Sequence, residues 1–343
     1  MPMRLIGSKR AERKLHARRP RAVAEKVYVD INGLPHGMFI QGADSGLPVL
    51  LYLHGGMPEY FLTERYPTGL EDNFTVAWWE QRGTGLSYSP DIPPAAKTSE
   101  QFIADTLAVT NYLRNRFRKQ KIYLMAHSGG TFVGLQSAAS APELYSAYVG
   151  VAQAVAQLES ERLAYEYMLE QYKQRGDHRM VRKLEAAPVT SAAGTPGAYL
   201  AVRDRAMHRL GVGTTRDMKS VVSGVFWPSL RSPQYSPSEK LRMWLGKAAS
   251  GVSVLWGEML ATNLAERVTR LEVPAYFFHG IHDYTVSYQL AKTYVEGLDA
   301  PLKGFYTFSK SAHSPIFEEP EKCMRIMRDD VLAGTNSHAD SGE

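Results

Sequence analysis

The chain has 343 residues, of which 44% are hydrophobic, and a formal net charge of +5. A chain of this size buries a large core without disulfides or structural metals, and its single cysteine, Cys323, excludes an internal disulfide. Much of the positive charge lies near the N-terminus, where nine basic residues stand against two acidic ones between Arg4 and Lys26. Such a run can touch anionic lipid or nucleic acid, but it is more often a solvated extension.

Both ends of the chain are predicted to be flexible. Residues 1–24 form the basic extension, and residues 333–343 are small and polar. No run of about 18 apolar residues occurs, and no apolar signal-peptide core follows the basic run. We therefore expect a cytoplasmic protein with no transmembrane segment.

The first elements in chain order are predicted to be strands. Residues 26–31 alternate in polarity, and the turn Asn32-Gly33 predicts a hairpin with residues 38–40. Residues 48–53 and 74–79 are short apolar runs, which are typical of strands buried on both faces of a parallel sheet. Thr98 and Gln101 then have the capping-box spacing that opens a helix, which we expect to end near Arg118.

The run from Ile122 to Gly130 predicts a nucleophile. A buried strand that turns sharply into a helix, with serine at the bend, exposes that serine at the top of an α/β-hydrolase sheet. The close approach of strand and helix admits only small residues two positions either side, here Ala126 and Gly130. The ordinary alternative is a strand-to-loop turn with an incidental serine, since short motifs also occur by chance.

Backbone donors for an oxyanion are predicted beside this serine. His54-Gly55-Gly56 follows a buried strand, and its glycines allow an N–H group to approach a substrate closely. Acyl transfer needs two such donors for the tetrahedral intermediate. We expect them to be the N–H groups of Gly56 and Gly129, although a simple glycine turn would look the same.

An acid and a base follow in the required order. Asp283 comes just after the buried run 273–278, where a carboxylate can orient an imidazole. His313 follows the predicted strand 304–308. The chain has ten histidines, but the order Ser128, Asp283, His313 is that of the α/β hydrolases.

These segments resemble the α/β-hydrolase superfamily, and within it the prolyl aminopeptidase-like group, peptidase family S33. His54-Gly55-Gly56-Met57-Pro58 is similar to the group's His-Gly-Gly-Pro-Gly segment, and residues 80–87 are similar to its Asp-Gln-Arg-Gly-x-Gly-x-Ser segment. Met57-Pro58 replaces Pro-Gly, Glu80 replaces Asp, and Gly129 stands where that group tends to carry tryptophan. The resemblance covers roughly residues 27–152 and 266–332.

The predicted fold class is α/β, with a mostly parallel doubly wound sheet and an inserted helical cap. The core comprises residues 25–152 and 266–332, and the cap comprises residues 153–265, where strand signals stop. We expect cap helices over 157–175, 214–222, from Pro237 to about Lys247, and over 252–264. Its position between the nucleophile helix and the acid-bearing strand favours a lid over a separate helical domain.

The predicted reaction is hydrolysis through an acyl-enzyme, with Ser128 as nucleophile, His313 as base and Asp283 as its orienting acid. No cofactor or metal is expected, because His279 and His282 lack further ligands nearby. An aminopeptidase must bind a free ammonium group, which calls for carboxylates, whereas an apolar substrate calls for aromatic groups. The candidate substrate-binding residues are Glu59, Glu64, Glu159, Glu166, Trp227 and Glu258.

Three alternatives stay open at this point. An esterase or lactonase of hydrophobic small molecules would use the same triad with an apolar pocket. A non-catalytic ligand-binding protein could share the fold, although such proteins normally lose a triad member. Association of the basic N-terminal run with nucleic acid is the third, and no specific nucleic acid partner is expected. The expected partner is a small-molecule or short-peptide substrate.

Overall fold

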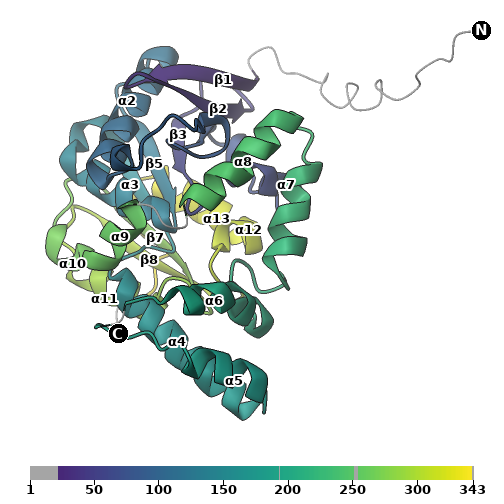
Figure 1. Cartoon of the computed structure of the whole chain (residues 1–343). Helices are drawn as coiled ribbons and strands as arrows, with labels where there is room; N and C mark the ends of the chain where they lie inside the picture. Colours follow the sequence, from purple (N-terminus) through teal and green to yellow (C-terminus); the bar gives the residue numbers. More distant parts are fainter. Residues whose placement is uncertain (1–21, 193, 251–253, 342–343) are drawn as a thin grey trace, which may run out of the picture.

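The computed structural model describes residues 22–192, 194–250 and 254–341, and in that part an eight-stranded sheet forms the centre (Figure 1). The strands are β1 (Val23–Ile31), β2 (Leu34–Gly42), β3 (Val49–Leu53), β4 (Thr75–Trp79), β5 (Ile122–His127), β6 (Tyr145–Val151), β7 (Ala275–Gly280) and β8 (Lys303–Phe308). They lie in the order β1-β2-β4-β3-β5-β6-β7-β8. The pairs β1–β2 and β2–β4 are antiparallel and the other pairs are parallel. The predicted α/β fold class is confirmed.

The parallel strands are apolar throughout because helices cover both faces of the sheet. Leu51 and Leu53 of β3 belong to the core on one face, whereas Leu50 and Tyr52 belong to the core on the other. Successive side chains of a strand point to opposite faces, so a strand covered twice needs no polar positions. Both faces therefore help to fix where the strands end, and those ends position the site.

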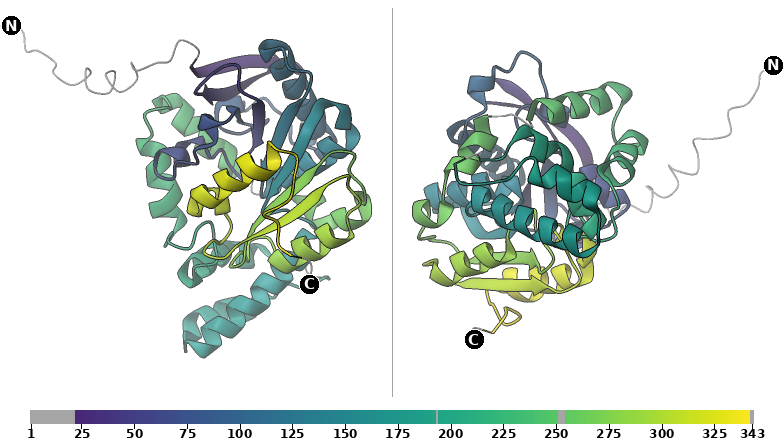
Figure 2. Two further views of the ribbon diagram at one scale, coloured as in Figure 1. Left: turned by 180° about the vertical axis from the view of Figure 1, so that it is seen from behind. Right: turned by 60° about the horizontal axis from the view of Figure 1, so that its bottom comes forward.

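The helices of the two faces follow the expected pattern. The first face carries α2 (Ser99–Phe117), α3 (Gly129–Ser140) and α11 (Tyr288–Gly297), and the second carries α12 (Pro315–Glu318) and α13 (Pro320–Ile326). Figure 2 shows α13 in front of the sheet when the molecule is seen from behind. The predicted start of α2 is confirmed, because Thr98 Oγ1 accepts a hydrogen bond of 3.3 Å from the N–H of Gln101.

Helices fill the chain between β6 and β7. They are α4 (Gln157–Gln174), α5 (His178–Glu185), α6 (Gly197–Leu210), α7 (Trp227–Arg231), α8 (Pro237–Ser250), α9 (Val254–Ala261) and α10 (Leu264–Arg267), with a π-helical turn at Val222–Phe226. The helices α4, α5 and α6 share a core of their own, and α4 and α5 project from the body of the molecule in Figure 1 and in the left view of Figure 2. The helix predicted after Ser236 is α8, and its capping box forms: the Ser236 N–H donates to Glu239 at 2.7 Å.

The helix predicted over residues 214–222 is wrong over most of its length, and the helices α5, α6 and α7 were not predicted. Residues 214–217 form bends, because Thr215 Oγ1 donates to Asp217 at 2.6 Å and accepts from the N–H of Met218 at 3.2 Å. Such local bonds from short polar side chains compete with a helix. Asp177 caps the start of α5, because its side chain accepts from the N–H of Met180 at 3.0 Å. This capping residue is a sequence signal from which α5 could have been predicted.

The two ends of the core differ from the expected boundaries. Most of the basic extension, residues 1–21, lies outside the described residues, and Val23 and Ala24 already pair with β2. Near the C-terminus, the expected flexible segment instead contacts β8: the Asp340 N–H donates to the Phe305 carbonyl at 2.8 Å. Within the described ranges, no helix is long and apolar enough to cross a membrane.

Candidate active site

Ser128 occupies the sharp turn between β5 and α3. Its φ of 56° and ψ of −127° are unusual for a residue with a side chain and cost on the order of 1–3 kcal/mol, a strain that clusters at functional sites. Gly130 is required behind it, since a Cβ there would lie 2.5 Å from the His54 carbonyl oxygen. The turn therefore has the geometry predicted for a nucleophile.

Ala126, which departs from the usual glycine, is accommodated by a second glycine. A Cβ added to Gly134 of α3 would lie 2.7 Å from the Cβ of Ala126. The space for the alanine methyl group is thus provided one helical turn into α3.

Asp283 and His313 are brought together from the ends of β7 and β8. The Nδ1 atom of His313 lies 2.8 Å from Oδ2 of Asp283, and both side chains are buried. The other oxygen, Oδ1, accepts from the N–H groups of Thr285 at 2.8 Å and Val286 at 3.0 Å. These bonds fix the carboxylate, which in turn orients the imidazole.

The charges around this pair suit a neutral base. Although burial alone would raise it, the neighbouring His313 and His279 hold the pKa of the Asp283 carboxyl well below its usual range. Burial lowers the pKa of His313, assisted by His127, and outweighs the opposing effect of Asp283. His313 is therefore neutral near pH 7 and has a ring nitrogen free of a proton.

The predicted oxyanion segment touches Ser128. A Cβ on Gly55 would lie 2.8 Å from the Cβ of Ser128, so this backbone passes directly over the turn. The His54 ring anchors it: Nε2 accepts from the Gln81 N–H at 3.1 Å, which leaves Nδ1–H to donate to the Gly55 carbonyl at 2.8 Å. The side-chain amide of Gln81 returns a bond of 2.7 Å to the His54 carbonyl. Residues 80–87 thus support this loop.

At Gly129 and Glu80, two positions where the chain departs from the group's motifs, the helical insertion supplies the neighbouring side chains. A Cβ on Gly129 would contact the Met259 side chain of α9 at 3.8 Å, so methionine lies where a large side chain would project. The Glu80 carboxylate accepts from the Tyr235 hydroxyl, just before α8. Both substitutions therefore bring core and insertion into contact.

His127, which precedes Ser128, was not singled out from the sequence. Its Nδ1 lies 2.8 Å and 3.0 Å from the two carboxylate oxygens of Glu59, and its Nε2 lies 2.8 Å from the backbone oxygen of His313. Both ring nitrogens face acceptors, so both carry protons. The Glu59 carboxylate counters the effect of burial and raises the pKa of His127. The ring thereby connects Glu59 to the backbone of the predicted base.

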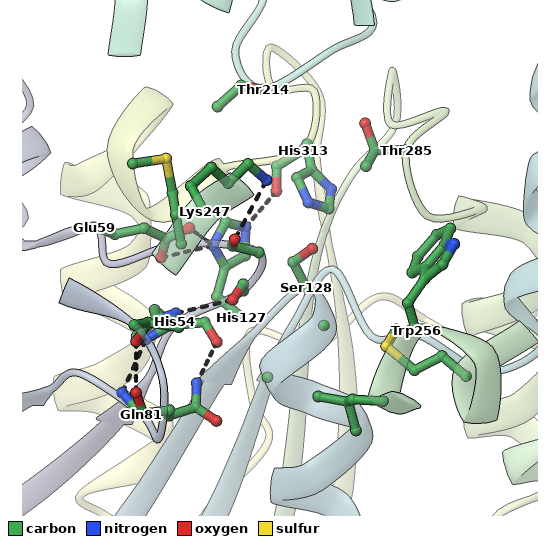
Figure 3. A pocket seen from close by; sticks show the side chains of 18 of the residues that line it. His54, Glu59, Gln81, His127, Ser128, Thr214, Lys247, Trp256, Thr285 and His313 are labelled. Atoms are coloured by element: carbon green, nitrogen blue, oxygen red, sulfur yellow. Dashed lines mark hydrogen bonds and ion pairs between the residues drawn. The ribbon is translucent and has the colours of Figure 1, made fainter. Parts of the chain in front are cut away.

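A cavity of about 420 Å³ surrounds Ser128, and Gly56, Gly129 and His313 also line it (Figure 3). The insertion contributes Arg203 and Asp204 of α6, Lys247 of α8, and Trp256 and Met259 of α9. Asp204 contacts Arg203 at 3.0 Å and remains 58% exposed. Insertion residues therefore determine much of the chemistry of the cavity.

Of the predicted substrate-binding residues, Glu59 lines the cavity. The others lie outside its lining, which corrects the expectation. Glu64 is exposed, Trp227 is 48% exposed, Glu159 and Glu166 pair with Arg162, and Glu258 accepts from the Ser99 N–H at 2.8 Å. Sequence spacing showed which glutamates share a helix face, but not which face meets the cavity.

No group of His, Cys, Asp or Glu side chains within residues 22–192, 194–250 and 254–341 could hold a metal ion. Asp283 follows His279 and His282 in the chain, and its ion pairs are with His313 and His279.

Comparison with known proteins agrees with this architecture. The family model for the alpha/beta hydrolase fold matches residues 48–320. The chain is 31% identical to the probable aminopeptidase YbaC of Bacillus subtilis (strain 168) over 88% of its own length and 94% of that protein.

Solved structures share the fold at low identity. A proline iminopeptidase from Mycobacterium smegmatis is 15% identical, with a TM-score of 0.58, over 90% of this chain and 98% of that one. A proline iminopeptidase-related protein from Thermus thermophilus is 18% identical, with a TM-score of 0.56, over 91% and 98%. The resemblance to the α/β-hydrolase superfamily is confirmed by the family model, and the 31% identical relative is named a probable aminopeptidase.

Proposed function

Because the chain belongs to the alpha/beta hydrolase fold family and is a hydrolase, we propose that it is a serine aminopeptidase acting through Ser128, His313 and Asp283. One observation carries the proposal. Ser128 sits at a strained strand–helix turn in a cavity that also contains His313, whose Nδ1 is held by Asp283 at 2.8 Å. A neutral, oriented imidazole beside a serine is what acyl transfer requires.

The reaction proceeds through an acyl-enzyme. His313 takes the proton of the Ser128 hydroxyl as its oxygen attacks the carbonyl carbon, and the N–H groups of Gly56 and Gly129 stabilise the oxyanion. Each donor contributes about 3–4 kcal/mol to lowering the barrier. His313 then gives the proton to the leaving nitrogen as the C–N bond breaks, and water attacks the ester to release the acid.

The carboxylates of Glu59 and Asp204 both line the cavity, and Asp204 is the one suited to a substrate ammonium group. Glu59 already accepts from His127 and from the Tyr52 hydroxyl at 2.5 Å. Asp204 also lines the cavity, and the neighbouring Arg203 and Lys247 lower the pKa of its carboxyl, which keeps it ionised. We therefore assign Asp204 as the partner of the substrate's N-terminal ammonium. The relative YbaC is named a probable aminopeptidase.

We also assign the insertion, residues 153–265, as a cap over this cavity. It supplies Asp204, Trp256 and Met259 to the lining. A cap of this kind excludes water and orients the substrate, which strengthens each charged contact inside.

An esterase or lactonase is the second candidate, because one side of the cavity is apolar. Leu255, Trp256 and Met259 of α9 lie there with Val286 and Phe102. These side chains suit a hydrophobic acyl group without an ammonium.

Paired turnover assays on proline p-nitroanilide and a short-chain p-nitrophenyl ester distinguish the two. An aminopeptidase cleaves the anilide and loses activity when the substrate amine is acetylated. The Ser128→Ala variant should lose roughly 10⁴–10⁶-fold in kcat with the fold intact by circular dichroism. Ester cleavage alone would favour the second candidate, and full activity of Ser128→Ala would refute the nucleophile assignment.

A further inference from the structure

The cavity contains more charge than the proposed reaction uses. Two of its cations are held by buried carboxylates away from the nucleophile. Arg82 donates to Asp105 through bonds of 2.6 and 2.7 Å, and Arg203 donates to Glu161 through two bonds of 2.6 Å. Both guanidinium groups therefore have carboxylate partners, and the ammonium groups of Lys97 and Lys247 also line the cavity.

Lys247 is placed beside the predicted oxyanion segment. It lies in the last turn of α8, lines the cavity, and its Nζ donates to the carbonyl oxygen of Gly56 at 3.3 Å. Burial lowers the pKa of the ammonium group, and Asp204 opposes the change. Lys247 is half-buried, and an ammonium group that is partly removed from water gains more from an incoming anion than a fully solvated one does.

The position of Lys247 places it on the side of the nucleophile where the leaving part of the substrate would lie. It contacts the segment Gly55–Gly56, which passes over Ser128. In Figure 3 its side chain points toward His313, whereas Trp256 lies on the other side of Ser128. Because His313 protonates the leaving nitrogen, a group on its side of the nucleophile meets the leaving part of the substrate.

We propose that Lys247 binds the carboxylate of the residue that leaves, so that the favoured substrates are dipeptides with a free C-terminus. This rests on the aminopeptidase function proposed above. In a dipeptide, the carboxylate is attached to the same carbon as the leaving nitrogen, so it lies close to the scissile bond. A longer peptide or a peptide amide places a neutral carbonyl group there, which gains much less from an ammonium.

The test compares Pro-Ala with its C-terminal amide, Pro-Ala-NH₂, on the wild type and on Lys247→Met. The wild type should cleave the free dipeptide with a kcat/KM about 10–100-fold above that of the amide, the range expected for one charge-assisted hydrogen bond. Lys247→Met should abolish this preference mainly by slowing cleavage of the free dipeptide. Lys247→Arg should keep most of it.

Lys240→Met is the matched control, because it removes one positive charge from the same helix at a position outside the cavity lining; it should keep the preference. Equal wild-type rates on the two substrates would overturn the carboxylate assignment while leaving the aminopeptidase function intact, and this comparison needs no variant. If Lys247→Met kept the preference for the free dipeptide, another residue would be responsible for that preference, and the assignment of Lys247 would be overturned. Failure to cleave either substrate would refute both proposals.

Discussion

At the scale of single residues, the pair His127–Glu59 gives the candidate site a fixed charge beside its proposed base. Both imidazole nitrogens of His127 face acceptors, at 2.8 Å in each case. The ring centroids of His127 and His313 lie 4.9 Å apart. A cation at this distance disfavours a second proton on His313, so His127 helps to keep the base neutral.

Replacing His127 should change the pH dependence of the reaction. In His127→Gln, His313 loses a neighbouring cation that lowers its pKa, so the pKa of His313 should rise. Activity requires neutral His313, so the acid limb of kcat/KM should move to higher pH. A pH profile of the two proteins on one substrate measures this.

Asp204→Asn provides the control, because it alters ammonium binding without touching either imidazole; its acid limb should stay near the wild-type position. An acid limb of His127→Gln that coincides with the wild type would mean that His127 carries no proton on one nitrogen.

At the scale of elements, the crossing of β5 and α3 depends on one small pair. The Cβ of Ala126 takes the space that a Cβ on Gly134 would need, with 2.7 Å between them, and the Tyr148 ring lies 3.3 Å from the same point. Strand and helix can approach as closely as the serine turn demands only while one of the two positions lacks a side chain.

Gly134→Ala should therefore destabilise the protein by about 1–3 kcal/mol, the usual cost of overpacking, despite the better helix propensity of alanine. Adding Ala126→Gly should recover most of the loss, since it removes the closer contact. Urea unfolding of the two single variants and the double variant gives the coupling. Additive effects would show that the two positions do not share this space.

Sequence patterns predict elements well where the signal is local. The capping boxes at Thr98 and Ser236 and the apolar strands are examples, because their hydrogen bonds and burial follow from adjacent residues. The order of Ser128, Asp283 and His313 likewise identified the residues that the fold brings to the strand ends. The predicted helix at 214–222 failed because hydroxyl bonds within Thr215–Met218 replaced helical ones.

At the scale of the whole molecule, the contacts between the insertion and the core cannot be predicted from sequence patterns. Asp204 of α6 and Lys247 of α8 line the cavity, and nothing in either helix alone specifies that these residues face it. Trp227, predicted at the site, lies on a face that remains exposed. Docking of the insertion thus decides which of its side chains line the cavity.

Glu239 is one residue that fixes this docking. It begins α8 and accepts from Lys26 of β1 at 2.8 Å and from the Tyr28 hydroxyl at 2.7 Å. Burial alone would raise its pKa, but Lys26, Tyr28 and Ser236 together lower it to about 2. A carboxyl whose pKa falls on folding stabilises the protein above its unfolded pKa and loses that contribution as the pH falls toward the folded value.

Glu239→Gln should accordingly destabilise the protein by about 1–2 kcal/mol at pH 7, because the bonds from Lys26 and Tyr28 lose their charge assistance. The difference from the wild type should shrink as the pH falls below about 4.5 toward 2, where the wild-type carboxyl takes up its proton. Urea unfolding at pH 7 and at about pH 3, inside this window, measures both values. A difference that is the same at both pH values would mean that Glu239 acts through shape and not through charge, and the insertion would then be held by its apolar contacts.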